Sequence, residues 1–70
     1  MDMRRVVGSN VRRLRLAKEL TQERFAEISG LSQQYISDLE RGRRNPTVVT
    51  LYEISVALGV SPVDLLRHND

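Results

Sequence analysis

The sequence predicts an all-α fold of five short helices, forming one domain over residues 1–70. Three observations predict it. Apolar residues recur at helical spacing, small polar residues suited to N-caps precede most segments, and glycines follow several of them. No alternating stretch typical of a strand competes with this pattern. The 70 residues include no cysteine and are 40% hydrophobic, which allows one small core and excludes a disulfide framework.

The first helix is expected over Met3 to about Lys18. Gly8 weakens its early turns, so a start at Ser9 or Asn10 is also compatible with the sequence. Arginines occupy the other faces of the segment. The apolar face follows helical spacing through Val7, Val11, Leu14 and the alkyl stem of Lys18.

The next two helices form a closely spaced pair. Thr21 is a suitable N-cap for a helix from Gln22 to Ser29, and Gly30 occupies the position of a left-handed C-terminal cap. Ser32 caps a third helix from Gln33 to about Arg41, which Gly42 closes. Ala26 is small enough to let the two helices cross closely. The side chains spaced to share a core are Phe25, Leu31, Ile36 and Leu39.

Two further helices complete the chain. The turn Asn45-Pro46-Thr47 leads into a fourth helix from Val48 to Leu58, which ends at Gly59. Ser61 caps a short fifth helix with Pro62 at its first position, where proline is tolerated because its missing N–H has no intrahelical partner there.

Positive charge is concentrated in one part of the chain. Residues 1–45 carry ten of the eleven basic side chains against six acids, whereas residues 46–70 carry one base against three acids. All but one of the cations are arginine, whose planar fork binds phosphate with two hydrogen bonds. With a pI near 9.7, this distribution indicates a polyanionic partner, although a solvated basic surface has the same composition.

The outward face of the third helix carries unusual side chains. If the apolar residues of this helix face the core, the opposite side presents Gln33, Gln34, Ser37 and Asp38. Glutamine pairs with adenine through two hydrogen bonds in the major groove, and serine bonds several bases or a phosphate. This face therefore suggests recognition of base edges.

Three runs carry a family resemblance: Leu20-Thr21-Gln22-Glu23-Arg24-Phe25-Ala26, Gly30-Leu31-Ser32, and Tyr35-Ile36-Ser37-Asp38-Leu39-Glu40-Arg41-Gly42. Together with Arg44-Asn45-Pro46-Thr47 and the segment from Leu51 to Val60, they resemble the Cro/cI-type (Xre) helix-turn-helix family over Val11 to Leu66. This family includes lambdoid phage repressors and restriction-modification controllers. The resemblance implies a lambda-repressor-like domain that regulates transcription by binding a palindromic operator as a dimer. Phage-type repressor, restriction-modification controller and antitoxin-type autoregulator all stay open as roles.

The resemblance also implies roles for individual residues. The base contacts would come from Ser32, Gln33, Gln34, Ser37 and Asp38. The phosphate contacts would come from Gln22, Tyr35, Arg12, Arg13, Arg43, Arg44 and Asn45. Arg15 and Glu40 would form an ion pair that ties the first helix to the third. Asp38 is repelled by phosphate unless it accepts from a cytosine amine, and a structural pair with a neighbouring arginine such as Arg41 is the favoured alternative. For Tyr35, half-buried packing is favoured over base stacking.

Two surfaces are candidates for protein partners. The C-terminal segment has more apolar side chains than a short helix can bury, which suggests a two-fold interface through Val60, Pro62, Val63, Leu65 and Leu66. Alternatively, Leu65 and Leu66 close the base of the core. Glu23 and Glu27 lie on one side of the second helix, and such a pair is usually a solvated face. In activating members of the family, acids there contact RNA polymerase.

Other classes of function find little support. His68 is the one histidine and lacks co-ligands, no glycine-rich phosphate loop exists, and nothing marks a nucleophile with its base. We therefore expect no enzyme activity, no metal and no cofactor. The apolar stripe of the first helix is too narrow for a membrane-surface helix, and no secretory signal begins the chain, so we expect a cytoplasmic protein. The alternative function is a protein-protein interaction module of the same fold, without specific DNA binding.

Overall fold

Each helix begins at a side chain that accepts a hydrogen bond from the first-turn backbone. The capping residues are Asp2, Thr21, Ser32, Thr47 and Ser61. Each cap satisfies an N–H group that has no partner inside its helix. At the other end, Gly30 and Gly59 adopt left-handed conformations with φ of 78° and 69°, which stop α2 and α4.

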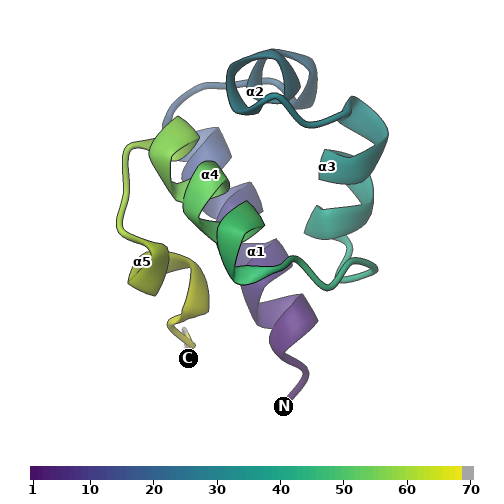
Figure 1. The fold of residues 1–70 in the computed structure, drawn as a ribbon, viewed down its shortest axis with the longest axis vertical. Coiled ribbons are helices and arrows are strands. Elements are labelled where there is room, and N and C mark those ends of the chain that lie inside the picture. Colours follow the sequence, from purple (N-terminus) through teal and green to yellow (C-terminus); the bar gives the residue numbers. More distant parts are fainter. Residues whose placement is uncertain (69–70) are drawn as a thin grey trace.

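The computed structural model describes residues 1–68. Its helices are α1 (Met3–Ala17), α2 (Gln22–Ser29), α3 (Gln33–Glu40), α4 (Val48–Leu58) and α5 (Pro62–Leu66). Among the described residues there is no strand, so the predicted all-α class is confirmed. In Figure 1, α1 lies behind α4, with α2 and α3 on one side of this pair and α5 on the other. Helix α1 contacts α3, α4 and α5, while α2 packs on α3 and α4.

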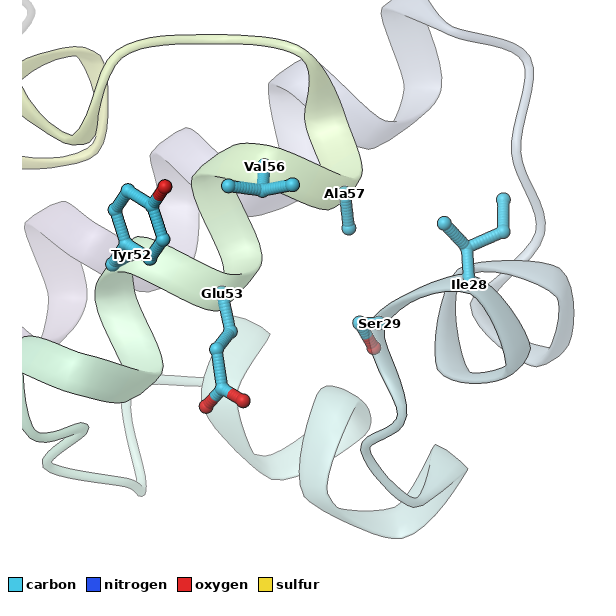
Figure 2. Close-up of a pocket in the computed structure, with 6 residues that line it drawn as sticks. All are labelled: Ile28, Ser29, Tyr52, Glu53, Val56 and Ala57. Atoms are coloured by element: carbon cyan, nitrogen blue, oxygen red, sulfur yellow. The ribbon is translucent and has the colours of Figure 1, made fainter.

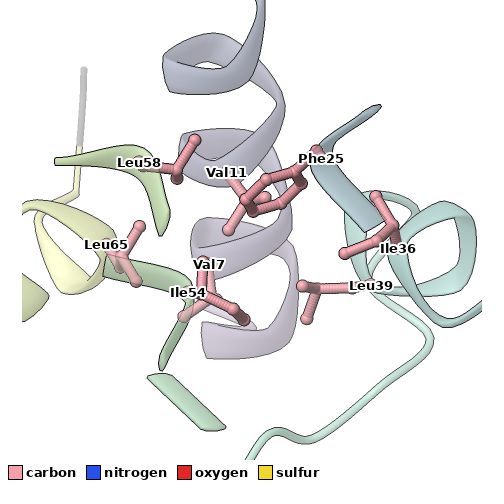
Figure 3. Packing of buried hydrophobic residues seen from close by; sticks show 8 residues of the cluster. All are labelled: Val7, Val11, Phe25, Ile36, Leu39, Ile54, Leu58 and Leu65. Carbon is pink, nitrogen blue, oxygen red and sulfur yellow. The ribbon is translucent and has the colours of Figure 1, made fainter. Parts of the chain in front are cut away.

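Every helix contributes to one hydrophobic core. The core residues have at most 4% of their surface exposed and are Val7, Val11, Phe25, Ile36, Leu39, Ile54, Leu58 and Leu65. Figure 3 shows the core side chains of the other helices meeting those of α1 from both sides. The expected core positions of α2 and α3 are therefore correct, with Leu31 packed against the cluster as a partly buried neighbour.

The apolar face expected for α1 is wrong at one position. Lys18 is the C-cap residue of α1 and is exposed, so its stem does not extend the core. The buried residue near this end is Arg15, whose charge is paired as described below. A long cation at the end of a helix reaches solvent easily, which explains why Lys18 stays outside.

Helix α1 begins at Met3, so Gly8 does not shift the start of the helix to Ser9 or Asn10. The glycine is buried where α1 meets the end of α3. A β-carbon there would clash with the carbonyl oxygen of Leu39, and the carbonyl oxygen of Glu40 lies 3.1 Å from the same position. Gly8 is therefore required for the close approach of the two helices.

Asn10 anchors the C-terminal helix. Its side chain is buried, and its amide nitrogen donates to the carbonyl oxygens of Leu65 at 2.9 Å and Arg67 at 2.8 Å. These carbonyls lie at the end of α5, where no further helical turn supplies donors. No local pattern in the sequence indicates this role, because the partners lie more than 50 residues away.

We expect Gly8→Ala to destabilise the protein by about 1–3 kcal/mol, since α1 and α3 must separate to admit the methyl group. In an isolated helix, the same replacement would be stabilising by about 1 kcal/mol. The expected change in the free energy of unfolding therefore has the opposite sign to the one that helix propensity alone predicts. Urea unfolding followed by circular dichroism measures the change. Ser9→Ala, at an exposed neighbouring position, is the control. A Gly8→Ala protein as stable as the wild type would contradict the close-approach argument.

Candidate nucleic-acid interface

The turn between α2 and α3 sets the direction of α3. Gly30 adopts its left-handed conformation directly after α2, and Ser32 starts α3 two residues later by accepting the Tyr35 N–H at 3.0 Å. Ile36 and Leu39 are held in the core, which turns the opposite side of α3 outward. Gln33 and Gln34 are exposed on that side, whereas Ser37 and Asp38 are partly buried.

Asp38 is paired, but with a different arginine from the one expected. Its carboxylate accepts the Gln34 amide at 3.1 Å and lies 3.5 Å from the Arg44 guanidinium. Arg41, which the helical spacing favoured as the partner of Asp38, does not form this ion pair; Arg44 does. The chain reverses at Gly42, where φ is 76°, and the Arg43 N–H then bonds the Asp38 carbonyl at 2.9 Å. This turn brings Arg44 back against α3.

Tyr35 is half-buried, as the packing interpretation expects. The Arg44 guanidinium lies over its ring, 5.1 Å from the centroid, which is a favourable cation–π distance. Burial raises the pKa of the Tyr35 hydroxyl, and the charge of Arg44 opposes this rise. The hydroxyl therefore stays protonated at neutral pH and can donate to an anion.

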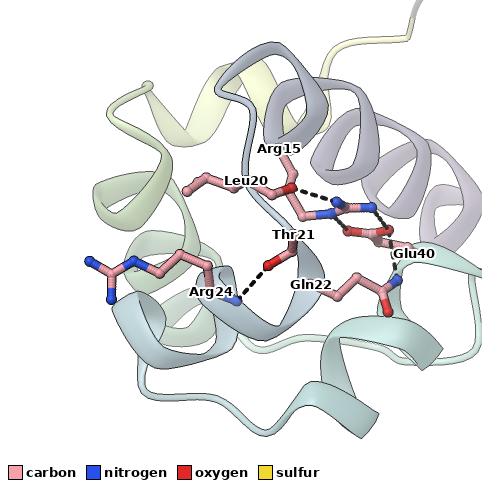
Figure 4. A network of polar contacts seen from close by, with 6 residues as sticks. All are labelled: Arg15, Leu20, Thr21, Gln22, Arg24 and Glu40. Carbon is pink, nitrogen blue, oxygen red and sulfur yellow. Dashed lines mark hydrogen bonds and ion pairs between the residues drawn. The ribbon is translucent and has the colours of Figure 1, made fainter.

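A buried ion pair joins α1 to α3 (Figure 4). Arg15 donates from Nε and Nη2 to the two carboxylate oxygens of Glu40, at 2.7 and 3.0 Å. Only 8% of the Arg15 side chain and 3% of the Glu40 side chain are exposed. Arg15 also donates to the carbonyl oxygen of Leu20 at 2.7 Å, just before α2. The resemblance implied this pair, and the structure contains it with two parallel hydrogen bonds.

Gln22 extends the same cluster to the start of α2. Its amide nitrogen donates to Glu40 at 3.2 Å, which uses one of its two N–H groups. The side chain is partly exposed, and it stands at the first position of α2, where the helix dipole is positive. Gln22 is therefore oriented by Glu40 at a helix end that favours an anion.

The loop after α3 forms an exposed basic segment. Arg43, Arg44 and Asn45 all lie on the surface. Arg5 of α1, which is not among the expected phosphate contacts, lies beside this loop, since its Cγ is 2.9 Å from the position of a β-carbon on Gly42. Arg12 and Arg13 are exposed on α1, and Arg13 donates to the Asn10 side chain at 3.4 Å.

The expected dimer interface is wrong for Leu65. This side chain is fully buried among the core residues of its own chain, so it cannot contact a partner. The alternative, in which it closes the base of the core, is correct for Leu65. On the same short helix, Val63 and Leu66 are 56% and 43% exposed. Val60 and Pro62 are partly buried.

A larger apolar surface lies on α4 and was missed. The exposed side chains are Val48, Val49, Tyr52 and Val56, and Glu53 is the one charged residue of this helix. Figure 2 shows Tyr52 and Val56 beside a groove of about 340 Å³, with Ile28 and Ser29 of α2 on its other side. A helix with apolar residues on most of its sides normally has most of them covered, and the sequence of α4 shows this pattern.

The remaining candidates fit a solvated surface. Glu23 and Glu27 are exposed on α2, and Glu27 pairs with Arg24 at 2.9 Å.

Within residues 1–68, no group of three or more histidine and acidic side chains is placed to hold a metal ion. No helix in this part of the chain is long and apolar enough to cross a membrane.

Residues 11–65 match the family described as Helix-turn-helix, HTH_3. An uncharacterized HTH-type transcriptional regulator, y4dJ of Sinorhizobium fredii, is 64% identical over 70 residues, which cover all of this chain and 91% of the relative. The control protein C.BamHI of Bacillus amyloliquefaciens is 46% identical over 66 residues, which cover 93% of this chain and 82% of the relative.

A solved structure agrees with these sequence relatives. The restriction-modification controller protein C.Esp1396I, determined as a tetramer in complex with its natural 35-base-pair operator, superposes with a TM-score of 0.84 at 37% identity. The match covers 93% of this chain and 86% of that one.

We expect Glu40→Leu to lower the free energy of unfolding by about 3–5 kcal/mol, because it leaves the buried Arg15 guanidinium without its counter-charge. The double variant Arg15→Met/Glu40→Leu should be more stable than this single variant, since no unpaired charge remains. Urea unfolding compares the two. A double variant that is less stable than Glu40→Leu alone would contradict this account.

Proposed function

The chain belongs to the helix-turn-helix family HTH_3, and we propose that it regulates transcription by inserting α3 into the major groove of an operator. The supporting observation is the exposed amide face of α3, where Gln33 and Gln34 stand next to the basic loop that carries Arg43 and Arg44. This function requires no catalytic step. Membership of the family agrees with the resemblance to Cro/cI-type regulators.

The contacts divide into two kinds. Gln33 and Gln34 have two donors and one acceptor each, which suits them to base edges, and Ser37 lies one turn further along α3. Gln22, Tyr35, Arg43 and Arg44 supply donors for phosphates on either side of the groove. Ser32 Oγ accepts the N–H of Tyr35 through one lone pair, which leaves its hydroxyl proton and a second lone pair for a contact with a base.

Reading a palindrome requires a second copy. The chain measures 30 Å along its longest axis, whereas half-sites are separated by about 34–36 Å. We place the dimer face on the exposed apolar side chains of α4, continuing onto Val63 and Leu66 of α5, with Val60 and Pro62 at its edge. Covering both helices removes the largest group of exposed apolar side chains from water.

The names of two similar proteins favour one role. C.BamHI is a control protein and C.Esp1396I a restriction-modification controller, so we propose a controller role over a phage repressor or an antitoxin. Glu23 and Glu27 are exposed, as contact with RNA polymerase would require. The Arg24–Glu27 ion pair is also typical of a solvated helix face.

We expect Gln33→Ala/Gln34→Ala to relax sequence preference. Each lost base pairing should cost about 1–3 kcal/mol on the preferred duplex and little on a scrambled one. Binding-site selection on random duplexes with the wild type provides the preferred duplex, and fluorescence anisotropy measures both affinities.

Arg43→Ala is the matched comparison for a phosphate contact. It should weaken binding to both duplexes alike and reduce the slope of log K against log salt by about one. If the glutamine variant keeps the preference of the wild type, the glutamines do not read bases. If wild-type binding is insensitive to salt, the interaction-module alternative is favoured.

We expect Val56→Glu to produce folded monomers, because this side chain is 61% exposed on α4 and its replacement leaves the core of the chain intact. Sedimentation velocity measures the oligomeric state. Leu65→Glu should instead unfold the chain, since Leu65 is fully buried. Ser9→Glu adds the same charge at an exposed site on α1 and should leave the dimer intact. A dimeric Val56→Glu protein would rule out the α4 face.

A further inference from the structure

One carboxylate organises the outer face of α3. Asp38 accepts the Gln34 amide through one oxygen at 3.1 Å and the Arg44 guanidinium through the other at 3.5 Å. Arg44 in turn lies on the Tyr35 ring. The Asp38 side chain is 20% exposed and that of Arg44 is 47% exposed. Two of the side chains assigned above to DNA are therefore held by an acid when no DNA is present.

This arrangement sets two conditions on binding. A phosphate that approaches Arg44 has to compete with the Asp38 carboxylate for the same guanidinium. Asp38 itself enters a strongly negative environment as α3 approaches the duplex. In the major groove, the donors that can compensate a carboxylate are the amino groups of cytosine and adenine. Every base pair carries one such amino group, on its cytosine or adenine. A pair in the reversed orientation turns the acceptors of guanine or thymine towards Asp38 and leaves its carboxylate without a donor.

We propose that Asp38 is a specificity-determining residue that acts mainly by weakening binding to wrong sequences. It keeps Arg44 from binding phosphate indiscriminately, and it penalises duplexes that place a guanine or thymine edge, rather than an amino group, opposite the second turn of α3. Specificity is a difference between affinities, and an unpaired charge against competitors increases it as effectively as a new contact to the target. The inference rests on the proposed insertion of α3 into the major groove.

Asp38→Asn tests the inference with little change of shape. Asparagine still accepts from Gln34 through its carbonyl oxygen, but it lacks the charge that holds Arg44 and repels phosphate. The probes are the duplex that the wild type selects from a random pool and a scrambled duplex of the same composition. We expect the variant to bind the scrambled duplex about tenfold more tightly and the selected duplex no more tightly, so the ratio of affinities falls about tenfold.

The salt dependence gives a second readout. If Arg44 is released to bind phosphate, the slope of log K against log salt on the scrambled duplex should steepen by about one in Asp38→Asn. Asp38→Ser, which also lacks the charge, should show the same loss of discrimination. Thermal unfolding of each variant verifies that α3 is still folded.

Glu27→Gln is the matched control. It also removes one negative charge and one arginine partner, Arg24, but it lies at an exposed position of α2 away from Asp38. It should change both affinities by a similar, small factor. If Asp38→Asn behaves like Glu27→Gln, or keeps the discrimination of the wild type, the inference is overturned while the proposed function stands. If the wild type itself fails to distinguish the two duplexes, the proposed function fails, and this inference fails with it.

Discussion

The arrangement of the helices depends on the buried pair of Arg15 and Glu40. Through its two hydrogen bonds, the pair fixes the end of α1 against the end of α3, and each partner reaches one further group. Arg15 holds the carbonyl of Leu20 before α2, and Glu40 holds the amide of Gln22 at its start. No buried side-chain nitrogen or oxygen within residues 1–68 lacks a hydrogen-bond partner. A charged pair is tolerated in this small core because every polar atom around it is satisfied.

Two residues of α1, Gly8 and Arg15, hold the end of α3 in place. Gly8 lets the α1 backbone approach the last turn of α3. The end of α3 is thus fixed by packing against α1 and by the ion pair with Arg15. With its inner side and its C-terminal end both held, α3 offers a rigid outer face, and a rigid helix positions polar side chains with little entropy left to lose on binding.

Local signals in the sequence were sufficient for the helices and insufficient for several side-chain partners. The caps at Thr21 and Ser32 and the glycines at 30 and 59 act within a few residues, so the ends of α2 and α4 were predicted correctly. The pairing of Asp38 with Arg44 depends on how the loop turns after α3, and a helical spacing rule favoured Arg41 instead. Leu65 and Leu66 could not be told apart, because a helix of five residues has too few turns to define a buried side. The contact of Arg5 with Gly42 joins distant parts of the chain and leaves no local pattern.

The exposed apolar side of α4 has a consequence for how such a regulator responds in a cell. While copies are scarce, this side faces water and each copy has only the contacts of a single α3 to hold it on DNA. In the dimer proposed above, pairing covers the apolar side once copies accumulate and doubles the number of contacts per binding event. Occupancy of the operator then rises with about the square of the protein level. Under this proposal, association through α4 converts gradual synthesis into a steeper genetic response.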